Sequence, residues 1–312
     1  MSQYRCSLAL SVAFFIFGLF LPVSATPPAG WPAPANLGIG SSPTFRNSPD
    51  GDLTLTFERD EQLFQSHFEA SGSWSTPVLS ATATSAAGFR ATDPDGVSFL
   101  ACTKEDGSIC VSPPSETVVA GPGKIRSDIL HFSIDGSGTK HLLYARTQEY
   151  DTGSDYSGSD VFYRKQVGNV WADEIPVASG LSISRTFQLP GISVTSQGRV
   201  HLCSYRDIYH GAGEGQFTRE RCPIQDFSMP ARIAADANDT LHFVYQSFAE
   251  DAPYDQDRLK YVSKGPAGWG QPEVVGIQYA ERIPDLTITP AGELFIAWED
   301  PDGNILVTHR LP

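Results

Sequence analysis

Residues 237–245 read Ala237-Asn238-Asp239-Thr240-Leu241-His242-Phe243-Val244-Tyr245, a tight turn followed at once by an alternating apolar run. Asn and Asp accept the positive φ that a short hairpin loop needs. Apolar side chains at every second position are typical of a strand with one buried face. This stretch therefore predicts a β-hairpin, and the rest of the chain repeats it.

The turn-and-strand pattern occurs six times along the chain. Its turns are Pro49-Asp50-Gly51, Pro94-Asp95-Gly96, Gly136-Ser137-Gly138, Ser196-Gln197-Gly198, Ala237-Asn238-Asp239 and Pro290-Ala291-Gly292. The strands that follow lie at 53–57, 97–101, 141–144, 200–203, 241–245 and 294–298. Third strands follow, for example at 63–68, 160–165, 259–262 and 304–309, and Trp with Pro announces a fourth at 74–77, 171–176 and 269–272. Four strands in a period of about 40–50 residues are typical of propeller blades. We therefore predict an all-β fold, a six-bladed β-propeller of four-stranded antiparallel blades.

The two ends of the chain predict how the ring closes. The sixth unit ends after its third strand at 304–309, while Gly30-Trp31 with Pro34 repeats the Gly-Trp-x-x-Pro pattern of residues 268–272. An N-terminal strand that completes the C-terminal blade would remove the open sheet edges. The expected blades are 42–79, 87–119, 129–178, 189–226, 230–276, and 283–312 together with 30–38.

The first 25 residues have the pattern of a signal peptide. A short cationic head is followed by the apolar run 8–21 and by small residues at Val23-Ser24-Ala25. We expect cleavage after Ala25, which leaves one propeller domain over 26–312 that is secreted or periplasmic, monomeric and without a membrane span. An uncleaved N-terminal anchor is the alternative.

The chain is acidic, with a formal net charge of −14. Loss of the first 25 residues would remove one Arg and no acid, so the mature chain would be one unit more negative. Nucleic-acid binding depends on Lys and Arg that neutralise phosphates. The charge therefore argues against a nucleic-acid partner and most simply serves solubility.

Four cysteines remain after residue 25 and form two pairs in the sequence. Cys102 and Cys110 flank the hairpin loop at Glu105-Asp106-Gly107, and Cys203 and Cys222 flank a second hairpin. Opposed positions of an antiparallel pair have a separation suitable for a disulfide, and export favours oxidation. Two disulfides are predicted, with buried free thiols as the alternative.

The strand order predicts which face of the ring carries a function. The tight turns would gather at one rim, here called the tight-turn face. The opposite rim, here called the loop-rich face, would receive the long segments 147–159, 206–215 and 248–256 and the crossovers between blades. Long loops on a rigid scaffold are common binding sites. The expected ligand contacts on the loop-rich face are Arg126, Asp128, Arg185, Tyr205, Arg206, Asp207, His210 and Arg282.

Two acidic loops allow a second prediction. Asp151, Asp155 and Asp160 place carboxylates at short spacing among glycines, as a calcium site requires. A solvated acidic loop explains the same residues, and segment 250–257 has the same two interpretations. We expect no required cofactor and a calcium ion only as a structural ligand. His141, His201 and His242 occupy similar positions in successive units, which predicts packing roles.

Residues 282–286, Arg-Ile-Pro-Asp-Leu, and the repeats around them resemble the sialidase superfamily with its BNR or Asp-box blades. The Asp-box pattern is incomplete, since Ser71-Gly72-Ser73-Trp74 and Gly168-Asn169-Val170-Trp171 keep only fragments of it. The resemblance implies that Arg282 belongs to a clamp of three arginines for a substrate carboxylate. The equivalent positions of the other units hold no arginine: Ser41, Ala86, Asp128, Gln188 and Ser228.

The leading hypothesis is an exported, non-catalytic propeller that recognises a carbohydrate or other extracellular ligand. An exo-acting glycoside hydrolase of sialidase type is the alternative. It would use Glu299 and Tyr205 as the nucleophile pair and Asp128 or Asp285 as the acid. A polysaccharide lyase that uses Tyr209 and His210 and a protein-docking platform are further alternatives. No serine-hydrolase, nucleotide-binding or metalloprotease motif occurs.

Overall fold

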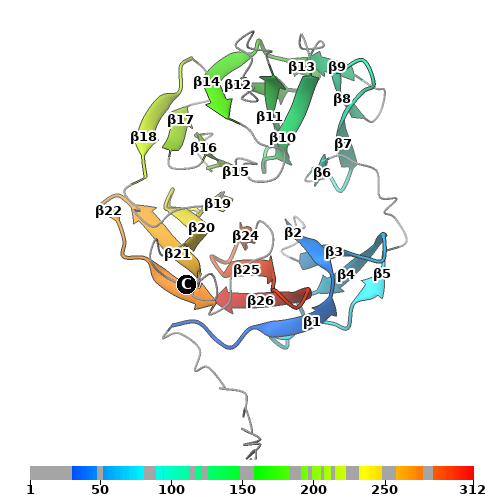
Figure 1. Cartoon of the computed structure of the whole chain (residues 1–312), viewed down its shortest axis with the longest axis vertical. Coiled ribbons are helices and arrows are strands. Elements are labelled where there is room, and N and C mark those ends of the chain that lie inside the picture. Colours follow the sequence, from blue (N-terminus) through cyan, green and yellow to red (C-terminus); the bar gives the residue numbers. More distant parts are fainter. Residues whose placement is uncertain are drawn as a thin grey trace, which may run out of the picture.

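The protein forms a ring of six antiparallel sheets, a six-bladed β-propeller (Figure 1). The computed structural model describes residues 30–47, 52–80, 89–93, 95–112, 117–120, 126–147, 158–182, 191–195, 199–204, 207–211, 215–222, 232–247, 258–276 and 284–312. All regular elements in these ranges are strands, and none of them contains a helix that could cross a membrane. The predicted fold class is confirmed.

The first three blades follow one another along the chain. Blade one contains β2 (Ser41–Asn47), β3 (Leu53–Arg59), β4 (Gln62–His67) and β5 (Val78–Leu79). Blade two contains β6 (Phe89–Thr92), β7 (Ser98–Thr103), β8 (Ile109–Ser112) and β9 (Thr117–Ala120). Blade three contains β10 (Arg126–Ile134), β11 (Lys140–Thr147), β12 (Gly158–Val167), β13 (Val170–Trp171) and β14 (Ile175–Ser182).

The last three blades complete the ring. Blade four contains β15 (Gly191–Val194), β16 (Val200–Ser204), β17 (Asp207–Gly211) and β18 (Thr218–Arg221). Blade five contains β19 (Arg232–Ala235), β20 (Leu241–Ser247), β21 (Arg258–Gly265), β22 (Gly268–Trp269) and β23 (Glu273–Gly276). Blade six contains β24 (Asp285–Ile288), β25 (Leu294–Glu299), β26 (Asn304–Arg310) and β1 (Ala35–Ile39).

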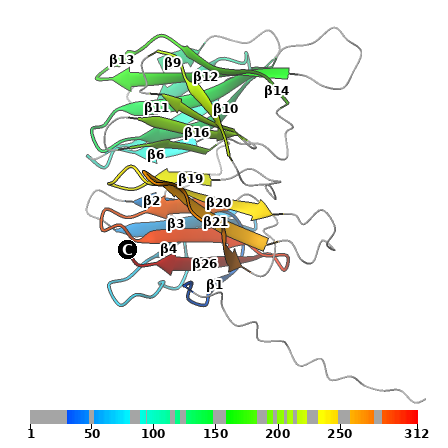
Figure 2. The ribbon, with the colours of Figure 1, turned by 90° about the vertical axis from the view of Figure 1, so that its left-hand side faces the viewer.

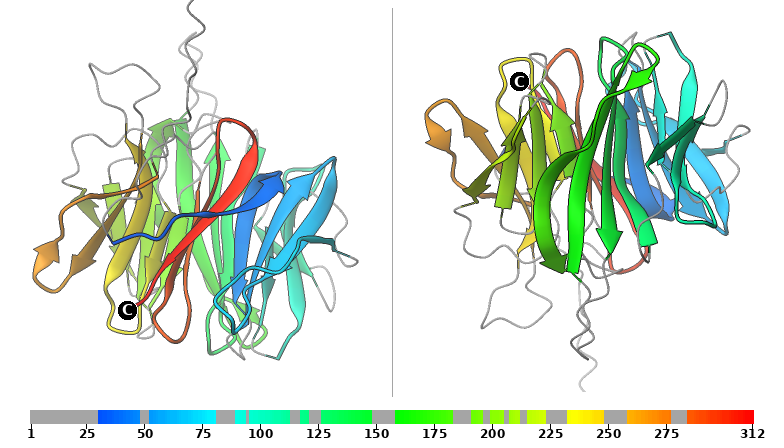
Figure 3. Two further views of the ribbon diagram at one scale, coloured as in Figure 1. Left: turned by 90° about the horizontal axis from the view of Figure 1, so that it is seen from below. Right: turned by 90° about the horizontal axis from the view of Figure 1, so that it is seen from above.

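Neighbouring blades contact one another through their first strands, which surround the axis of the ring. Seen from the side, the strands run between the same two rims (Figure 2 and Figure 3). The spaces between blades are filled by apolar side chains. Between blades five and six, for example, Leu259, Leu286 and Trp298 share one cluster of buried residues.

The tight turns are held by a side chain that precedes the predicted turn residues. Asp135 accepts hydrogen bonds from the backbone nitrogens of Ser137 and Thr139, both at 2.9 Å, and Gly138 has a φ of 80°. Asp93 and Asp236 cap predicted turns in the same way, and Asp300 caps the turn between β25 and β26. A carboxylate that satisfies two backbone donors fixes the hairpin loop and therefore the register of the strands beside it. The turns at 49–51 and 196–198 lie outside the described residues.

The ring closes as the sequence predicts. Strand β1 pairs antiparallel with β26, with Ala35 opposite Val307 (Figure 1). Trp31 is 3% exposed and donates a hydrogen bond from its indole nitrogen to Glu273 at 3.2 Å. Arg310 donates to the same carboxylate at 2.8 Å. The N-terminal segment therefore joins blade five to blade six as well as completing the sheet.

Asp285 links three blades near the axis. Its carboxylate accepts a hydrogen bond from the backbone nitrogen of Phe45 in blade one at 2.7 Å and lies 3.6 Å from the Arg232 guanidinium of blade five. Burial raises the pKa of Asp285, while Arg232 and the backbone donors act in the opposite direction. A carboxylate with these partners braces the ring rather than standing free for proton transfer.

The structure brings one of the two predicted cysteine pairs face to face. Cys102 lies directly opposite Cys110, as predicted, and their sulfur atoms are 2.8 Å apart. A disulfide bond is about 2.05 Å long, so the two sulfur atoms are not at disulfide distance. Cys203 and Cys222 lie in the apolar cluster between blades four and five. Both disulfides remain predictions.

Replacement of Trp31 tests the closure. Trp31→Ala is expected to lower the free energy of unfolding by about 3–5 kcal/mol, because it empties a buried site between two blades. Urea unfolding measures this change. Val170→Ala serves as the control, since Val170 is 71% exposed and its truncation should change stability by less than about 0.5 kcal/mol. Equal effects of the two substitutions would contradict the closure.

Candidate functional site

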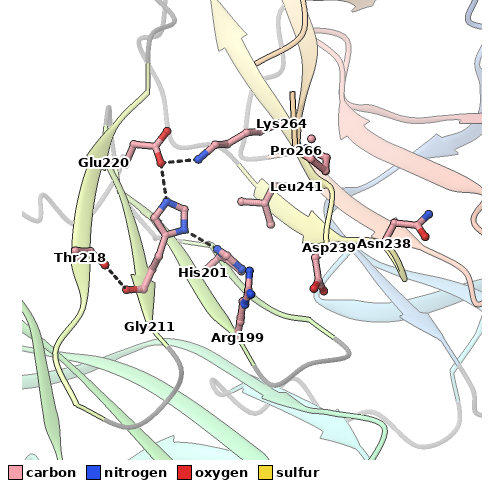
Figure 4. A pocket seen from close by; sticks show the side chains of 12 residues that line it. Arg199, His201, Gly211, Thr218, Glu220, Asn238, Asp239, Leu241, Lys264 and Pro266 are labelled. Carbon is pink, nitrogen blue, oxygen red and sulfur yellow. Dashed lines mark hydrogen bonds and ion pairs between the residues drawn. The ribbon is translucent and has the colours of Figure 1, made fainter. Parts of the chain in front are cut away.

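A polar cavity lies between blades four and five. Its volume is about 650 Å³, and it is lined by Arg199, His201, His210, Gly211, Thr218, Glu220, Asn238, Asp239, Leu241, Lys264, Gly265 and Pro266 (Figure 4). Asn238 and Asp239 belong to the tight turn between β19 and β20, and Lys264 lies near the end of β21. The cavity therefore opens on the tight-turn face, opposite to the loop-rich face where a site was expected.

Three adjacent strands of blade four supply a chain of hydrogen bonds. His201 on β16 lies directly opposite His210 on β17, and their Nδ1 atoms are 2.7 Å apart. The Nε2 atom of His210 lies 3.2 Å from Glu220 on β18. Because all three side chains stand on one sheet, their relative positions are fixed by strand pairing (Figure 4).

Glu220 also connects blade four to blade five. The Lys264 ammonium donates to its carboxylate at 2.5 Å, and the indole nitrogen of Trp269 donates at 3.3 Å. Partial burial disfavours the charge, but the hydrogen bonds and charge of Lys264, with help from Trp269 and His210, lower the pKa of Glu220. Glu220 is therefore an ionised acceptor of hydrogen bonds.

Both histidines are neutral near pH 7. Burial, with the nearby positive charges of Lys264 and Arg199 and the His210 ring, lowers the pKa of His201 to about 4. Burial and Lys264 lower the pKa of His210, and Glu220 offsets this only in part. Two neutral imidazoles that share one hydrogen bond must each carry a single N–H.

The bond to Glu220 determines the positions of these protons. The ionised carboxylate only accepts, so His210 carries its proton on Nε2 and accepts at Nδ1. His201 must then donate from Nδ1, which leaves a lone pair on its Nε2 atom. Among the described residues this buried Nε2 has no hydrogen-bond partner. Blade four therefore holds an unsatisfied acceptor at the cavity wall.

The equivalent histidines in blades three and five have different surroundings. His141 lies 3.2 Å from Asp135 and 2.7 Å from the Tyr163 hydroxyl. His242 lies 3.5 Å from Asp236 and 2.7 Å from the Tyr261 hydroxyl. Each of these rings bridges its capping Asp and a Tyr, which agrees with the packing role expected from their recurrence.

Blade four departs from this arrangement at two positions. Thr195 stands where the capping Asp stands in blades three and five, and its hydroxyl accepts from the Arg199 backbone instead. Ile208, opposite Cys203, stands where the Tyr stands. His201 has therefore lost both scaffold partners and bonds to His210, so the packing role expected for His201 does not describe its contacts.

Two more polar groups belong to the cavity wall. Arg199 is exposed, and the structure gives its guanidinium no ion pair or hydrogen bond within the described ranges. Asp239 has a left-handed φ of 59°, and its Oδ1 atom has no partner among the described residues. Figure 4 shows Arg199 and His201 of blade four across the cavity from Asp239 and Leu241 of blade five. The cavity thus offers a fork-shaped donor and two acceptors.

A smaller cavity of about 320 Å³ lies between blades three and four. Val177, Ala178 and Ser179 of β14 face residues of β17 and β18 there. Asp207 and Arg219 form an ion pair in its wall at 2.7 Å. A paired wall of this kind leaves little unsatisfied polarity for a ligand.

The prediction of a loop at 206–215 is wrong for Asp207 and His210, because both residues belong to strand β17. Asp207 lies in the smaller cavity, while His210 lies in the larger one near the opposite end of the strand. Tyr209 and His210 are successive strand residues and point to opposite faces of the sheet. The lyase hypothesis needed this pair in one site, and the geometry separates them.

The remaining predicted site residues lie away from the cavity or outside the described residues. Arg126 and Asp128 lie on β10, the first strand of blade three, with Asp128 opposite Ala145. Asp160 lies on β12 opposite Arg146. Outside the described residues lie Arg185, Tyr205, Arg206, Arg282, Asp151 and Asp155. Within the described ranges no group of three His, Cys, Asp or Glu side chains is placed to hold a metal ion.

Sequence reasoning missed Arg199, Glu220, Asp239 and Lys264. Their one sequence signal was the replacement of the capping Asp by Thr195 in the fourth repeat, a departure that aligned repeats reveal. Glu220 and Lys264 carry no local motif, since they meet only across two blades.

No protein-family model matches the sequence, and no curated protein sequence matches it. Solved structures do resemble it. A gluconolactonase of Xanthomonas campestris, XC5397, is 12% identical with a TM-score of 0.53, and the match covers 94% of this chain and 99% of that one. An α-L-arabinanase of Penicillium chrysogenum, solved with arabinobiose, is 11% identical with a TM-score of 0.53 over 89% of this chain and 98% of that one.

These comparisons establish the class of protein. At such identities they show a shared fold, and the chain has the β-propeller architecture of these two enzymes. Neither of them is a sialidase, so the sialidase resemblance gains support for its propeller fold only.

The buried His201 predicts a specific pH dependence of stability. Its pKa of about 4 lies below the value of about 6.5 for an unfolded histidine. The unfolded chain therefore takes up a proton first as the pH falls, and His201 removes about 3 kcal/mol of stability between pH 6.5 and pH 4. Urea unfolding at pH 7 and pH 4 should show a smaller loss for His201→Gln than for the wild type. Equal losses would contradict the neutral, buried state of His201.

Proposed function

We propose that this protein is an exported, monomeric propeller that binds a small carbohydrate, or another hydroxyl-rich extracellular molecule, between blades four and five. The observation that carries the proposal is the set of unsatisfied polar groups in that cavity. The Arg199 guanidinium can donate, while His201 Nε2 and Asp239 Oδ1 can accept. Sugar hydroxyls both donate and accept, so they complement such a set.

The dimensions and lining of the cavity agree with this ligand class. A volume of about 650 Å³ falls in the range of small-ligand sites, roughly 300–1,000 Å³. Leu241 and Pro266 supply apolar surface beside the polar groups. A sugar ring presents the same mixture of C–H faces and hydroxyl edges.

The compared structures give limited support. The arabinanase was solved with a disaccharide, and the gluconolactonase is named for a sugar derivative. Their scaffold therefore serves carbohydrate chemistry in those proteins. For this chain the argument rests on its own cavity, and export rests on the signal-peptide pattern of residues 1–25.

Ligand binding provides the direct test. We expect isothermal titration of the mature protein against a panel of mono- and disaccharides, with arabinobiose among them, to identify a binder. Arg199→Ala should weaken that binder at least tenfold, because a fork donor to the ligand is lost. Arg219→Ala is the matched control, since Arg219 is an exposed arginine paired with Asp207 outside the cavity. Equal affinity of wild type and Arg199→Ala would place the site elsewhere.

An exo-acting glycoside hydrolase of sialidase type is the second candidate. The observation in its favour is the Arg232–Asp285 pair near the ring axis, where that family would bind a carboxylate. Asp285 already contacts partners in blades one and five, and Arg282 would need further arginines to form a clamp. The expected ligand contacts on the loop-rich face would then belong to this second site.

A fluorogenic sialoside separates the two candidates. We expect the wild-type protein to release no fluorophore above the buffer rate, because both carboxylate oxygens of Asp285 already contact Phe45 or Arg232 and are not directed at a leaving group. Sialoside hydrolysis that Arg282→Ala abolishes would instead establish the sialidase-type enzyme.

A further inference from the structure

We infer that the cavity between blades four and five is also a hydrolytic site, in which His201 Nε2 accepts a proton from a water molecule that attacks the carbonyl carbon of a sugar lactone or ester. This inference rests on the proposed function, since the cavity must first hold the sugar derivative. It adds a reaction and a substrate class to a binding site.

The geometry supplies a proton acceptor that is fixed in one orientation. Glu220 orients His210, and His210 orients His201, through contacts of 3.2 and 2.7 Å. His201 is 8% exposed and has no partner at Nε2 within the described part of the chain. An oriented lone pair meets the geometric requirement for a general base once the substrate is within reach. Glu220 and His210 act through His201 and are positioning residues.

The Glu220 carboxylate also stabilises the charge that forms in the reaction. When Nε2 gains a proton, His201 becomes an imidazolium, and its Nδ1 proton is shared with His210. The positive charge is then spread toward the ionised Glu220. The scaffold histidines His141 and His242 bond to a tyrosine hydroxyl at Nδ1 and face a capping Asp at Nε2. Neither has a second histidine through which to pass this charge.

The bonds and protons balance without a cofactor. Water loses one proton to His201 Nε2 as its oxygen bonds to the carbonyl carbon, and the carbonyl electron pair moves to oxygen. The resulting oxyanion can be stabilised by the Arg199 guanidinium, which has no other ion pair among the described residues. Collapse breaks the bond between the carbonyl carbon and the ester oxygen. That oxygen takes the proton back from Nε2, and the product is a hydroxy acid.

The same groups are unsuited to cleavage of a glycosidic bond. That reaction needs a protonated carboxylic acid beside the leaving group, with a raised pKa. The pKa of Glu220 is lowered, chiefly by Lys264, and its oxygens already accept three hydrogen bonds. Acyl-carbon chemistry needs only the base and a cation, and the cavity supplies both.

Access to His201 depends on the cavity wall. The ring lines the cavity, but the Nε2 atom itself is covered in the protein without ligand. Arg199 lines the same cavity, and its side chain is exposed. Among the described residues no ion pair or hydrogen bond holds its guanidinium in place. Catalysis therefore requires the groups that cover Nε2 to move when the substrate binds, and the Arg199 side chain lies beside the same cavity wall.

Hydrolysis of D-glucono-1,5-lactone tests the inference. Acid release in a pH-stat at pH 6.5 should exceed the buffer rate with the wild-type protein. His201→Gln should lower kcat at least 100-fold with little change in KM, since general-base catalysis contributes about 10²–10⁴-fold. His242→Gln, at the equivalent position of blade five, should stay within threefold of the wild type. Circular dichroism verifies that each variant is folded.

A second variant keeps the test decisive if His201→Gln does not fold. Glu220→Gln leaves the base in place but removes its orienting charge, so it should lower kcat and change the pH profile of kcat/KM. In the wild type kcat/KM should fall only as the pH approaches about 4, where His201 becomes protonated. An unchanged profile in Glu220→Gln would overturn the relay.

The failure of the inference can be told apart from the failure of the proposed function. Titration with gluconate, which cannot react, reports binding alone. Gluconate binding without lactone hydrolysis would overturn the inference and leave the binding site standing. No binding of gluconate or of any saccharide in the panel would overturn both. Hydrolysis that persists in His201→Gln would place the base elsewhere and also reject the inference.

Discussion

The pairing of β1 with β26 is the contact on which the rest of the structure depends. A ring of six sheets has stable neighbours all round only when the two chain ends meet within one blade, because an unpaired sheet edge exposes backbone donors and acceptors. Trp31 strengthens this joint by entering the apolar interface of blades five and six and bonding to Glu273. Closure holds neighbouring blades beside one another around the ring, and the cavity between blades four and five is lined by residues of two such neighbours.

The candidate site of this propeller follows from a departure within a repeat. Blades three and five surround their histidine with a capping Asp and a Tyr. His141 has a hydrogen-bond partner at both ring nitrogens, while His242 bonds to Tyr261 and its Nε2 lies 3.5 Å from Asp236 without a hydrogen bond. In blade four Thr195 and Ile208 replace those partners, and His210 and Glu220 form a new chain of contacts. This chain ends at His201 Nε2, an acceptor that has no donor among the residues the structure describes. The repeated contacts stabilise the fold, and the blade that departs from the repeat contributes unpaired polar groups to the cavity.

Charge pairs across blade boundaries hold this arrangement in place. Glu220 accepts from Lys264 and Trp269 of the next blade, so its carboxylate serves two purposes, as an inter-blade contact and as the group that orients His210. Asp285 does the equivalent near the axis by joining blades five, six and one. In both places a partly buried carboxylate is stabilised by several donors at once, because desolvation would otherwise favour its neutral form.

The sequence by itself determined the architecture. Turn residues such as Asn238-Asp239, the alternating strands and the Trp signals are local patterns with local causes, so six blades, their boundaries and the closure by residues 30–38 were all readable. Only the tertiary structure decided the candidate site. The long segment around His210 suggested a loop on one rim, yet strand pairing placed His210 beside a cavity at the other. Glu220 and Lys264 lie 44 residues apart and meet only because two blades pack side by side. Such contacts depend on the angle between sheets, and no local pattern in the chain encodes that angle.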